Sequence, residues 1–214
     1  MDYKTVNKKR YSVRDFSDKN VDNKILTRIT KEAQHTPSWA NAQPWKVYFA
    51  KGETLTKIKK DYKKYNRLGM NPHSDFYTMH RNDWGNYART NMADWNNDFS
   101  RFLIENRINF GQISDDLFNA PVVAFLTIEE FNPWSAYDLG AFGENLMLAA
   151  SDAGLASMPA FEFVKYPDIL REYLPVPDKE LIGMGIGLGY ARDKKVNEFH
   201  SSRVPLDEMM KISE

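Results

Sequence analysis

The run from Ile182 to Tyr190 most constrains how this chain folds, because a glycine stands at every second position. The sequence Ile-Gly-Met-Gly-Ile-Gly-Leu-Gly-Tyr alternates with the period of a β-strand, so one face carries large apolar side chains and the other carries only hydrogen atoms. Such a strand lets another part of the molecule approach one face very closely. The sequence therefore predicts a strand at 182–190 that is covered tightly on its glycine face.

The motifs that the chain lacks exclude several kinds of site. A dinucleotide-binding fingerprint needs G-x-G-x-x-G at the opening of a helix, but Tyr190 stands where the last glycine is required. Neither the G-x-x-x-x-G-K-[ST] motif of a phosphate-binding loop nor the G-x-S-x-G motif of an acyl-transfer enzyme is present. There is no cysteine, and the four histidines form no pair at metal-binding helical spacing, so we predict no metal site. Any redox chemistry therefore needs a bound cofactor.

The charge of the chain is balanced. Lys plus Arg and Asp plus Glu both total 29, which gives no general attraction to nucleic acid or to acidic membranes and leaves a nucleic-acid module as a weak alternative. No apolar run approaches the ~20 residues that a membrane-spanning helix needs, and residues 1–12 lack the apolar core of a signal peptide. We therefore expect a cytoplasmic protein that binds neither nucleic acid nor a membrane.

Hydrophobic periodicity predicts an α+β protein, which we interpret as a single domain over residues 1–214. The continuous apolar run 121–128 is typical of a strand buried on both faces, so it should be central in the sheet. Between 65 and 119 the sequence is polar, aromatic-rich and weakly periodic, and we expect a helical excursion that acts as a lid. The other expected elements are a strand at 45–50 and helices at 25–33, capped by Asp22, at 53–64, and from Pro167.

The clearest predicted helix covers 135–153. Ser135 and Asp138 have the spacing of a capping box, and Gly154 is placed to end the helix. Apolar residues lie nearly all round this helix, so it should be buried either in the core or in a subunit interface.

Three short segments carry candidate binding residues. Arg10, Ser12 and Arg14 occupy alternate positions, so an extended segment would point two guanidinium groups and a hydroxyl the same way, as a phosphate requires. The alternative is a solvated basic stretch. The loop 36–45 can turn amides and hydroxyls toward a polar heterocycle, although its Ser, Asn and Pro residues also suit an ordinary turn. The segment 201–205 places Arg203 near the end of the chain.

Taken together, these segments resemble the nitroreductase family of FMN-dependent NAD(P)H oxidoreductases. The matching patterns, in chain order, are R-x-S-x-R-x-F, P-S-x-x-N-x-Q-P-W, A-P-V, D-x-G-x-x-x-x-N-L-x-L-A-A from Asp138, the Pro159 segment, the glycine strand and the terminal S-R-x-P. The resemblance implies a central, mostly antiparallel sheet flanked by helices, in an intertwined homodimer that holds FMN between its subunits.

The resemblance also implies roles for the matching residues. Arg10, Ser12 and Arg203 would hold the FMN phosphate, and Arg14 would favour the negative charge that develops at N1 and O2 of the ring. Residues of the second segment would meet the ring and the ribityl chain, the 38–41 part coming from the other subunit. The expected contacts of that segment are Pro37, Ser38, Trp39, Asn41 and Gln43, and the remaining expected contacts are Tyr11, Pro159, Ala160, Phe161 and Glu162.

The implied activity is a ping-pong reaction without a catalytic side chain. NAD(P)H would pass hydride to flavin N5 and leave, and a nitroaromatic, a quinone or a similar electron-poor acceptor would then take the same place. The alternatives are a non-catalytic FMN-binding or flavin-storage protein, or a relative that acts as a flavin reductase, an enone reductase or a dehalogenase.

Two departures from the family pattern modify these expectations. The common P-x-E-G-F segment is here Pro159-Ala160-Phe161-Glu162-Phe163, so we expect the backbone contact with N5 to persist while the pocket over the ring changes shape. No family motif aligns with 65–119, where Asn82 and Asn86 are the candidates for a further FMN contact. We expect acceptor selectivity to reside in that stretch.

Overall fold

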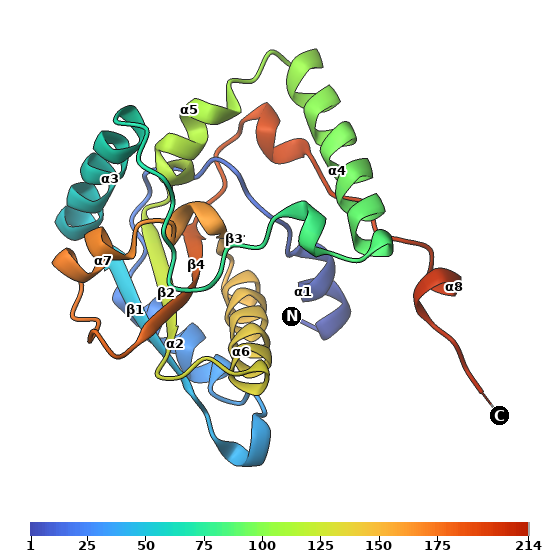
Figure 1. The fold of residues 1–214 in the computed structure, drawn as a ribbon, viewed down its shortest axis with the longest axis horizontal. Coiled ribbons are helices and arrows are strands. Elements are labelled where there is room, and N and C mark those ends of the chain that lie inside the picture. The colour runs from blue at the N-terminus through green and yellow to red at the C-terminus, as the bar shows by residue number, and fades with distance from the viewer. Residues whose placement is uncertain (214) are drawn as a thin grey trace.

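A computed structural model describes residues 1–213 of the chain. Its centre is a four-stranded sheet in the order β1-β2-β4-β3, in which every neighbouring pair is antiparallel (Figure 1). The strands are β1 (Trp45–Lys51), β2 (Val122–Ile128), β3 (Ala156–Ala160) and β4 (Leu181–Gly189). All seven residues of β2 are buried, which confirms the prediction of an internal strand at 121–128.

Helices cover both faces of the sheet (Figure 1). One face packs against α2 (Asn23–Ala33) and α6 (Pro133–Asp152), and the other packs against α3 (Gly52–Arg67), α5 (Phe110–Asp115) and α7 (Pro167–Tyr173). Alternate residues of β2 serve the two cores, because Ala124 and Leu126 face α2 and α6 whereas Val123 and Phe125 face the opposite side. The predicted α+β class is confirmed.

The helix α6 begins earlier than predicted. Asn132 is its N-cap, and its Oδ1 accepts hydrogen bonds from the backbone N–H groups of Trp134 and Ser135. In return, the Oγ of Ser135 accepts a hydrogen bond from the backbone N–H of Asn132, which completes the capping box. The prediction of Ser135 as the cap is therefore wrong, because Pro133 at the first helical position extends the helix by a turn. Gly154 ends the helix at φ 80°, as predicted.

The glycines of β4 allow the close approach that their alternation predicts. A Cβ added to Gly185 would lie 2.2 Å from the Cβ of Phe163, and one added to Gly187 would lie 2.8 Å from the Cζ of the same ring. Gly183 departs from the prediction of a single glycine face. A β-bulge between Leu126 and Thr127 leaves Gly183 as the extra residue, and it faces α6 instead.

The remaining elements lie in the N-terminal segment, in the 65–119 excursion, in loops between strands and helices, and in the C-terminal segment. The excursion contains η2 (Arg81–Asp83), α4 (Asn86–Glu105) and α5, and it ends in η3 (Leu117–Asn119), a turn whose three non-glycine residues all have left-handed φ values of 49–58°. The short helix α1 (Tyr3–Lys9), which no sequence pattern above predicts, is capped by Asp2. The other elements are η1 (Trp39–Asn41), η4 (Phe161–Phe163), η5 (Lys195–Glu198) and α8 (Leu206–Met209). Within residues 1–213, no helix is both long enough and apolar enough to cross a bilayer.

Gly185→Ala is expected to destabilise the protein by about 3 kcal/mol, because the new methyl group would overlap the Cβ of Phe163 and force the strand and η4 apart. Gly111→Ala is the matched control, since the nearest atom to an added Cβ lies 3.6 Å away, at ordinary contact distance. Urea unfolding at one protein concentration measures both free energies. Equal stability of the two variants would contradict this account of the glycine face.

Candidate functional site

The first candidate segment and the end of the chain meet around one basic cavity. The cavity has a volume of about 180 Å³ and is lined by the predicted residues Arg10, Tyr11, Ser12, Arg14 and Arg203. Lys8 and His200, which the sequence did not single out, also line it. The predicted convergence of the N-terminal and C-terminal motifs is therefore observed within one chain, and its lining is suited to an anion.

Arg14 is a buried cation within this cavity, with only 4% of its surface exposed. Its guanidinium Nη1 donates to the backbone oxygens of Ser12 and Phe199 at 3.0 and 3.1 Å, and the rings of Phe99 and Phe199 flank it. Burial lowers the pKa of Arg14 to about 10, so the group remains charged at neutral pH. Among residues 1–213 it forms no ion pair with a carboxylate, since the adjacent Asp15 pairs with Arg192 instead, and a bound anion would supply the missing negative charge.

Arg10 has a similar unsatisfied group. Its Nε atom is buried without a hydrogen-bond partner, and the nearest carboxylate oxygen, from Glu144 on α6, lies 3.6 Å away. A buried donor that lacks a partner costs free energy unless a ligand or water satisfies it. Arg10 and Arg14 together therefore fit the phosphate and the electron-rich ring edge of a flavin nucleotide.

Asn197 positions this site and was missed by the sequence analysis. Its Oδ1 accepts hydrogen bonds from the backbone N–H groups of Arg14 and Asp15, at 2.7 and 3.0 Å. Its Nδ2 donates to the backbone oxygens of Asp15 and Arg192, at 2.7 and 2.8 Å. One buried amide thus ties the N-terminal segment to the C-terminal one, a contact between residues 183 positions apart that no local pattern reveals.

The edge strand β3 extends the site beyond the basic cavity. Ser12 forms a bridge to Ser157, whose backbone oxygen accepts a bond from the Val13 N–H at 3.1 Å, so the backbone groups of Ser157 point away from β4. Because alternate residues direct their backbone groups to the same edge, Pro159 follows Ser157 on that edge. The predicted Pro159 segment therefore continues from the basic cavity, and η4 with Phe161 begins directly after it.

The two residues that depart from the family pattern point in different directions. Phe161 is 41% exposed. Glu162 instead has an 18% exposed side chain that lies 2.6 Å from the Nζ of Lys165, and burial raises the pKa of its carboxyl group. The side chain of Glu162 is thus engaged by Lys165, and it lines neither the basic cavity nor the apolar cavity described below among residues 1–213.

An apolar cavity of about 220 Å³ lies beside this edge, between α6 and the ends of β3 and β4. Pro159 and Glu144 both line it, so it continues the path from the basic cavity, where Glu144 neighbours Arg10. Phe76 from the excursion lines it as well. The cationic cavity, which suits a phosphate, therefore adjoins an apolar cavity, which suits an uncharged aromatic molecule.

The second candidate segment lies apart from both cavities. Trp39 stacks on Trp134 with ring centres 4.6 Å apart, and the backbone N–H of Trp39 donates to the carboxylate of Asp138. The loop therefore meets the beginning of α6 (Figure 1). Ala40, Asn41 and Gln43 have positive φ values without being glycine, which stores backbone strain. Neither cavity is lined by any of the predicted residues Pro37, Ser38, Trp39, Asn41 or Gln43, as far as the described residues extend.

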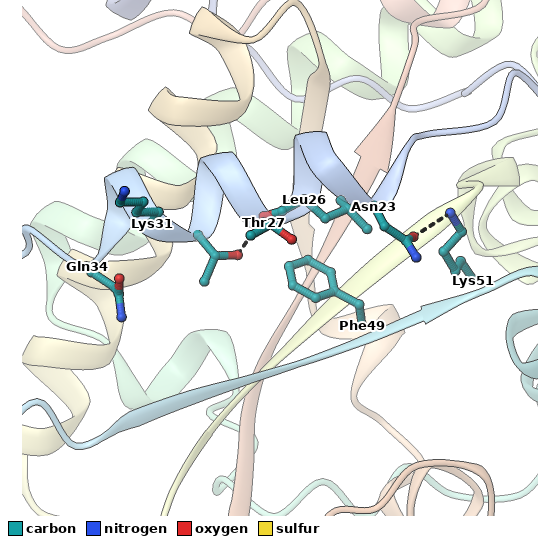
Figure 2. A pocket seen from close by; sticks show the side chains of 8 residues that line it. Asn23, Leu26, Thr27, Lys31, Gln34, Phe49 and Lys51 are labelled. Carbon is teal, nitrogen blue, oxygen red and sulfur yellow. Dashed lines mark hydrogen bonds between the residues drawn. The ribbon is translucent and has the colours of Figure 1, made fainter.

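The other candidates are not brought into the site. Asn82 lies in η2 and Asn86 begins α4, and neither lines the two cavities within the described chain. No cluster of potential metal ligands occurs among residues 1–213. A larger hollow of about 710 Å³ lies between α2 and β1, with Phe49 near its middle and Lys31 and Lys51 toward its two ends (Figure 2). It contains none of the candidate residues.

Comparisons with known proteins agree with this geometry. A chloronitrobenzene nitroreductase of Comamonas testosteroni is 27% identical over 216 residues, which cover 93% of this chain and 91% of the relative. A 4-nitrobenzoate reductase of Pseudomonas putida is 28% identical over 214 residues, which cover 95% of this chain and 91% of the relative.

Solved structures are similar over the whole chain. The FMN- and NADPH-dependent nitroreductase NfnB of Sphigopyxis sp. strain HMH superposes with a TM-score of 0.90 at 26% identity, covering 100% of both chains. The FMN-dependent NfnB of Mycobacterium smegmatis, solved in complex with NADPH, has the same TM-score and identity, covering 99% of this chain and 97% of that one. The sequence profile of the nitroreductase family matches residues 8–190. This chain therefore belongs to the nitroreductase family.

Proposed function

We propose that this protein is an FMN-dependent oxidoreductase that uses NAD(P)H to reduce nitroaromatic or similarly electron-poor compounds. The observation that carries the proposal is the buried, carboxylate-free Arg14 in a cavity shared with Arg10, Ser12 and Arg203. The relatives described as nitroreductases, and the FMN- and NADPH-dependent structures that superpose on the chain, support it. When bound, FMN accepts hydride from NAD(P)H and delivers it to the acceptor.

The residues of this chain would bind the cofactor, orient it and polarise its ring. Arg10, Ser12 and Arg203 would hold the phosphate, which would satisfy the buried Nε of Arg10. Arg14 places a fixed positive charge in a site of low dielectric constant, where it stabilises negative charge on a nearby ring. Pro159, which lines the adjoining apolar cavity, and the exposed Phe161 would contact the flavin ring.

We propose further that the working form is a homodimer and that the loop 37–43 completes the site of the partner. The loop is strained and exposed, and Trp39, which is 59% exposed, leaves a large aromatic surface for a second copy to cover. The exposed side of α6 carries Trp134 and Tyr137, at 54% and 71%, next to that loop. A cytoplasmic location, where NAD(P)H is available, completes the proposal.

Protein purified with excess FMN is expected to show bound-flavin absorbance near ~450 nm, which NADPH or NADH bleaches anaerobically and 4-nitrobenzoate restores. Stopped-flow absorbance follows both half-reactions. Absence of bound flavin would reject the cofactor proposal. Bound flavin that neither nucleotide bleaches would indicate a flavin-storage protein instead.

Arg14→Gln is expected to lower the midpoint potential of the bound FMN by roughly 30 mV, equal to about 1.4 kcal/mol for a two-electron couple, because a fixed positive charge is lost. Arg14→Lys retains that charge and should shift the potential less. Spectroscopic redox titration of both variants measures the difference. Identical potentials for wild type and Arg14→Gln would show that Arg14 does not act on the ring.

Subunit mixing tests the shared site. Arg203→Ala and Asn41→Ala homodimers are each expected to bind FMN weakly, whereas their co-expression should recover about a quarter of wild-type turnover, because half of the dimers are mixed and each contains one intact site. Co-expression of Arg203→Ala with Arg10→Ala is the matched control, since both changes affect the same half-site and no intact site forms. Equal recovery in the two mixtures would contradict a site shared between subunits.

A further inference from the structure

The excursion is fastened to the sheet at its beginning by Asp75. The Asp75 carboxylate accepts two hydrogen bonds from Arg171 of α7, at 3.2 and 2.8 Å, and a third from the backbone N–H of Ile182 at 2.7 Å. The side chains of Asp75 and Arg171 are only 13% and 20% exposed. A bidentate pair of this kind fixes orientation as well as distance, so the residue that follows Asp75 has a defined place.

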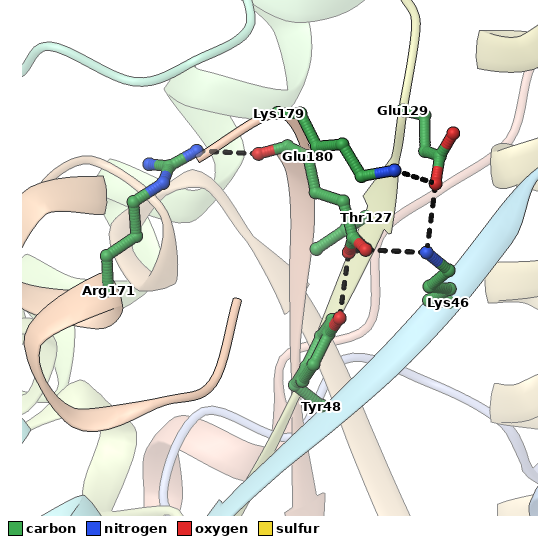
Figure 3. A network of polar contacts seen from close by, with 7 residues as sticks. All are labelled: Lys46, Tyr48, Thr127, Glu129, Arg171, Lys179 and Glu180. Atoms are coloured by element: carbon green, nitrogen blue, oxygen red, sulfur yellow. Dashed lines mark hydrogen bonds and ion pairs between the residues drawn. The ribbon is translucent and has the colours of Figure 1, made fainter. Parts of the chain in front are cut away.

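A second layer of polar contacts holds Arg171. Its Nη2 also donates to the backbone oxygen of Glu180 at 2.6 Å. The carboxylate of Glu180 is in turn buried and accepts bonds from Lys46, Tyr48 and Thr127, so the residue is anchored to β1 and β2 (Figure 3). The position of Asp75 is therefore determined by three strands and one helix rather than by the excursion itself.

The residue that this arrangement orients is Phe76. Its ring lies over Gly183, where an added Cβ would be 2.6 Å from the ring Cζ, so the bulge glycine leaves the space that the ring fills. Phe131 supports the ring in an edge-to-face arrangement with centres 5.0 Å apart. Across the described chain, Phe76 is the one residue of the excursion that lines the apolar cavity.

The apolar cavity also contains surfaces that belong to the proposed FMN site. Pro159 is shared with the edge of β3, and Glu144 reaches Arg10 of the basic cavity. A planar apolar molecule in this space would contact Met147, Met184 and the Phe76 ring, which all line it. The contacts of an acceptor therefore depend on how far the Phe76 ring projects.

We infer that Phe76 limits the size of the aromatic acceptor, and that the Asp75–Arg171 pair is the device that positions it. The inference rests on the proposed function. Single-ring nitroarenes bind against the Phe76 ring, whereas fused-ring nitroarenes are too wide for the cavity and clash with that ring. Asp75 and Arg171 contact neither cofactor nor acceptor and act only through Phe76.

The test compares acceptors of different width. Phe76→Ala is expected to raise the ratio of kcat/KM for 1-nitronaphthalene to that for nitrobenzene by about tenfold, through KM rather than kcat, because the ring that blocks the wider acceptor is removed. Asp75→Asn should change the ratio in the same direction by about threefold at unchanged FMN content. Tyr77→Ala is the matched control, since this neighbouring aromatic residue is 77% exposed, and it should leave the ratio unchanged.

The outcomes separate this inference from the proposed function. A ratio that stays unchanged in FMN-loaded Phe76→Ala overturns the inference, as does an equal change in Tyr77→Ala, while turnover by the wild type still supports the proposed function. Failure of the wild type to reduce either nitroarene overturns both. If Phe76→Ala does not fold, Phe76→Leu keeps most of the apolar contact with Gly183, and the same comparison of ratios decides.

Discussion

The ring of Phe163 lies directly against Gly185 and Gly187, and much of the fold depends on this contact. It allows η4 to approach β4 at a distance that no other residue at those two positions would permit. Since β4 is the strand between β2 and β3, the depth of this contact determines where the edge strand β3 lies. The candidate cofactor site follows that edge, so a packing contact in the core sets the shape of a functional surface.

The electrostatics of the site depend on bringing the two ends of the chain together. Asn197 joins the backbone of Arg14 to the C-terminal segment, and the same segment delivers His200 and Arg203 to the cavity. Cations brought together in this way repel one another, and among the described residues Glu144, 3.6 Å from the Nε of Arg10, offsets part of that repulsion. The net charge of the chain is zero, so the attraction for an anion is created locally by the fold.

Sequence reasoning succeeded where a pattern was local and failed where a position depends on distant partners. The buried strand at 121–128 is confirmed, because continuous apolar residues carry that information. That Arg10 and Arg203 line one cavity is not local information, and only the resemblance to a family brought these two residues together in the sequence. The cap of α6 was assigned to Ser135 because two overlapping capping patterns compete, and Pro133 decides between them. The bulge at Gly183 depends on the register with β2, which no property of β4 alone specifies.

The candidate site shows the same division. Asn197 and Phe76 have no periodicity or motif around them, and their places follow only from hydrogen bonds and packing across the sheet. Their environments could not be found without the assembled fold.

The left-handed turn at Leu117–Asn119 has a consequence for how the family can diversify. Phe118 and Asn119 hold this turn through the backbone bond from the Phe16 N–H and the side-chain bond to Asp15, directly before β2. Asp75 fastens the other end of the excursion. With both ends secured to the sheet, insertions, deletions and substitutions in the connection between α4 and α5 need not disturb the strands. The helix α4 itself is more constrained, because its Phe99 ring flanks Arg14 of the candidate site.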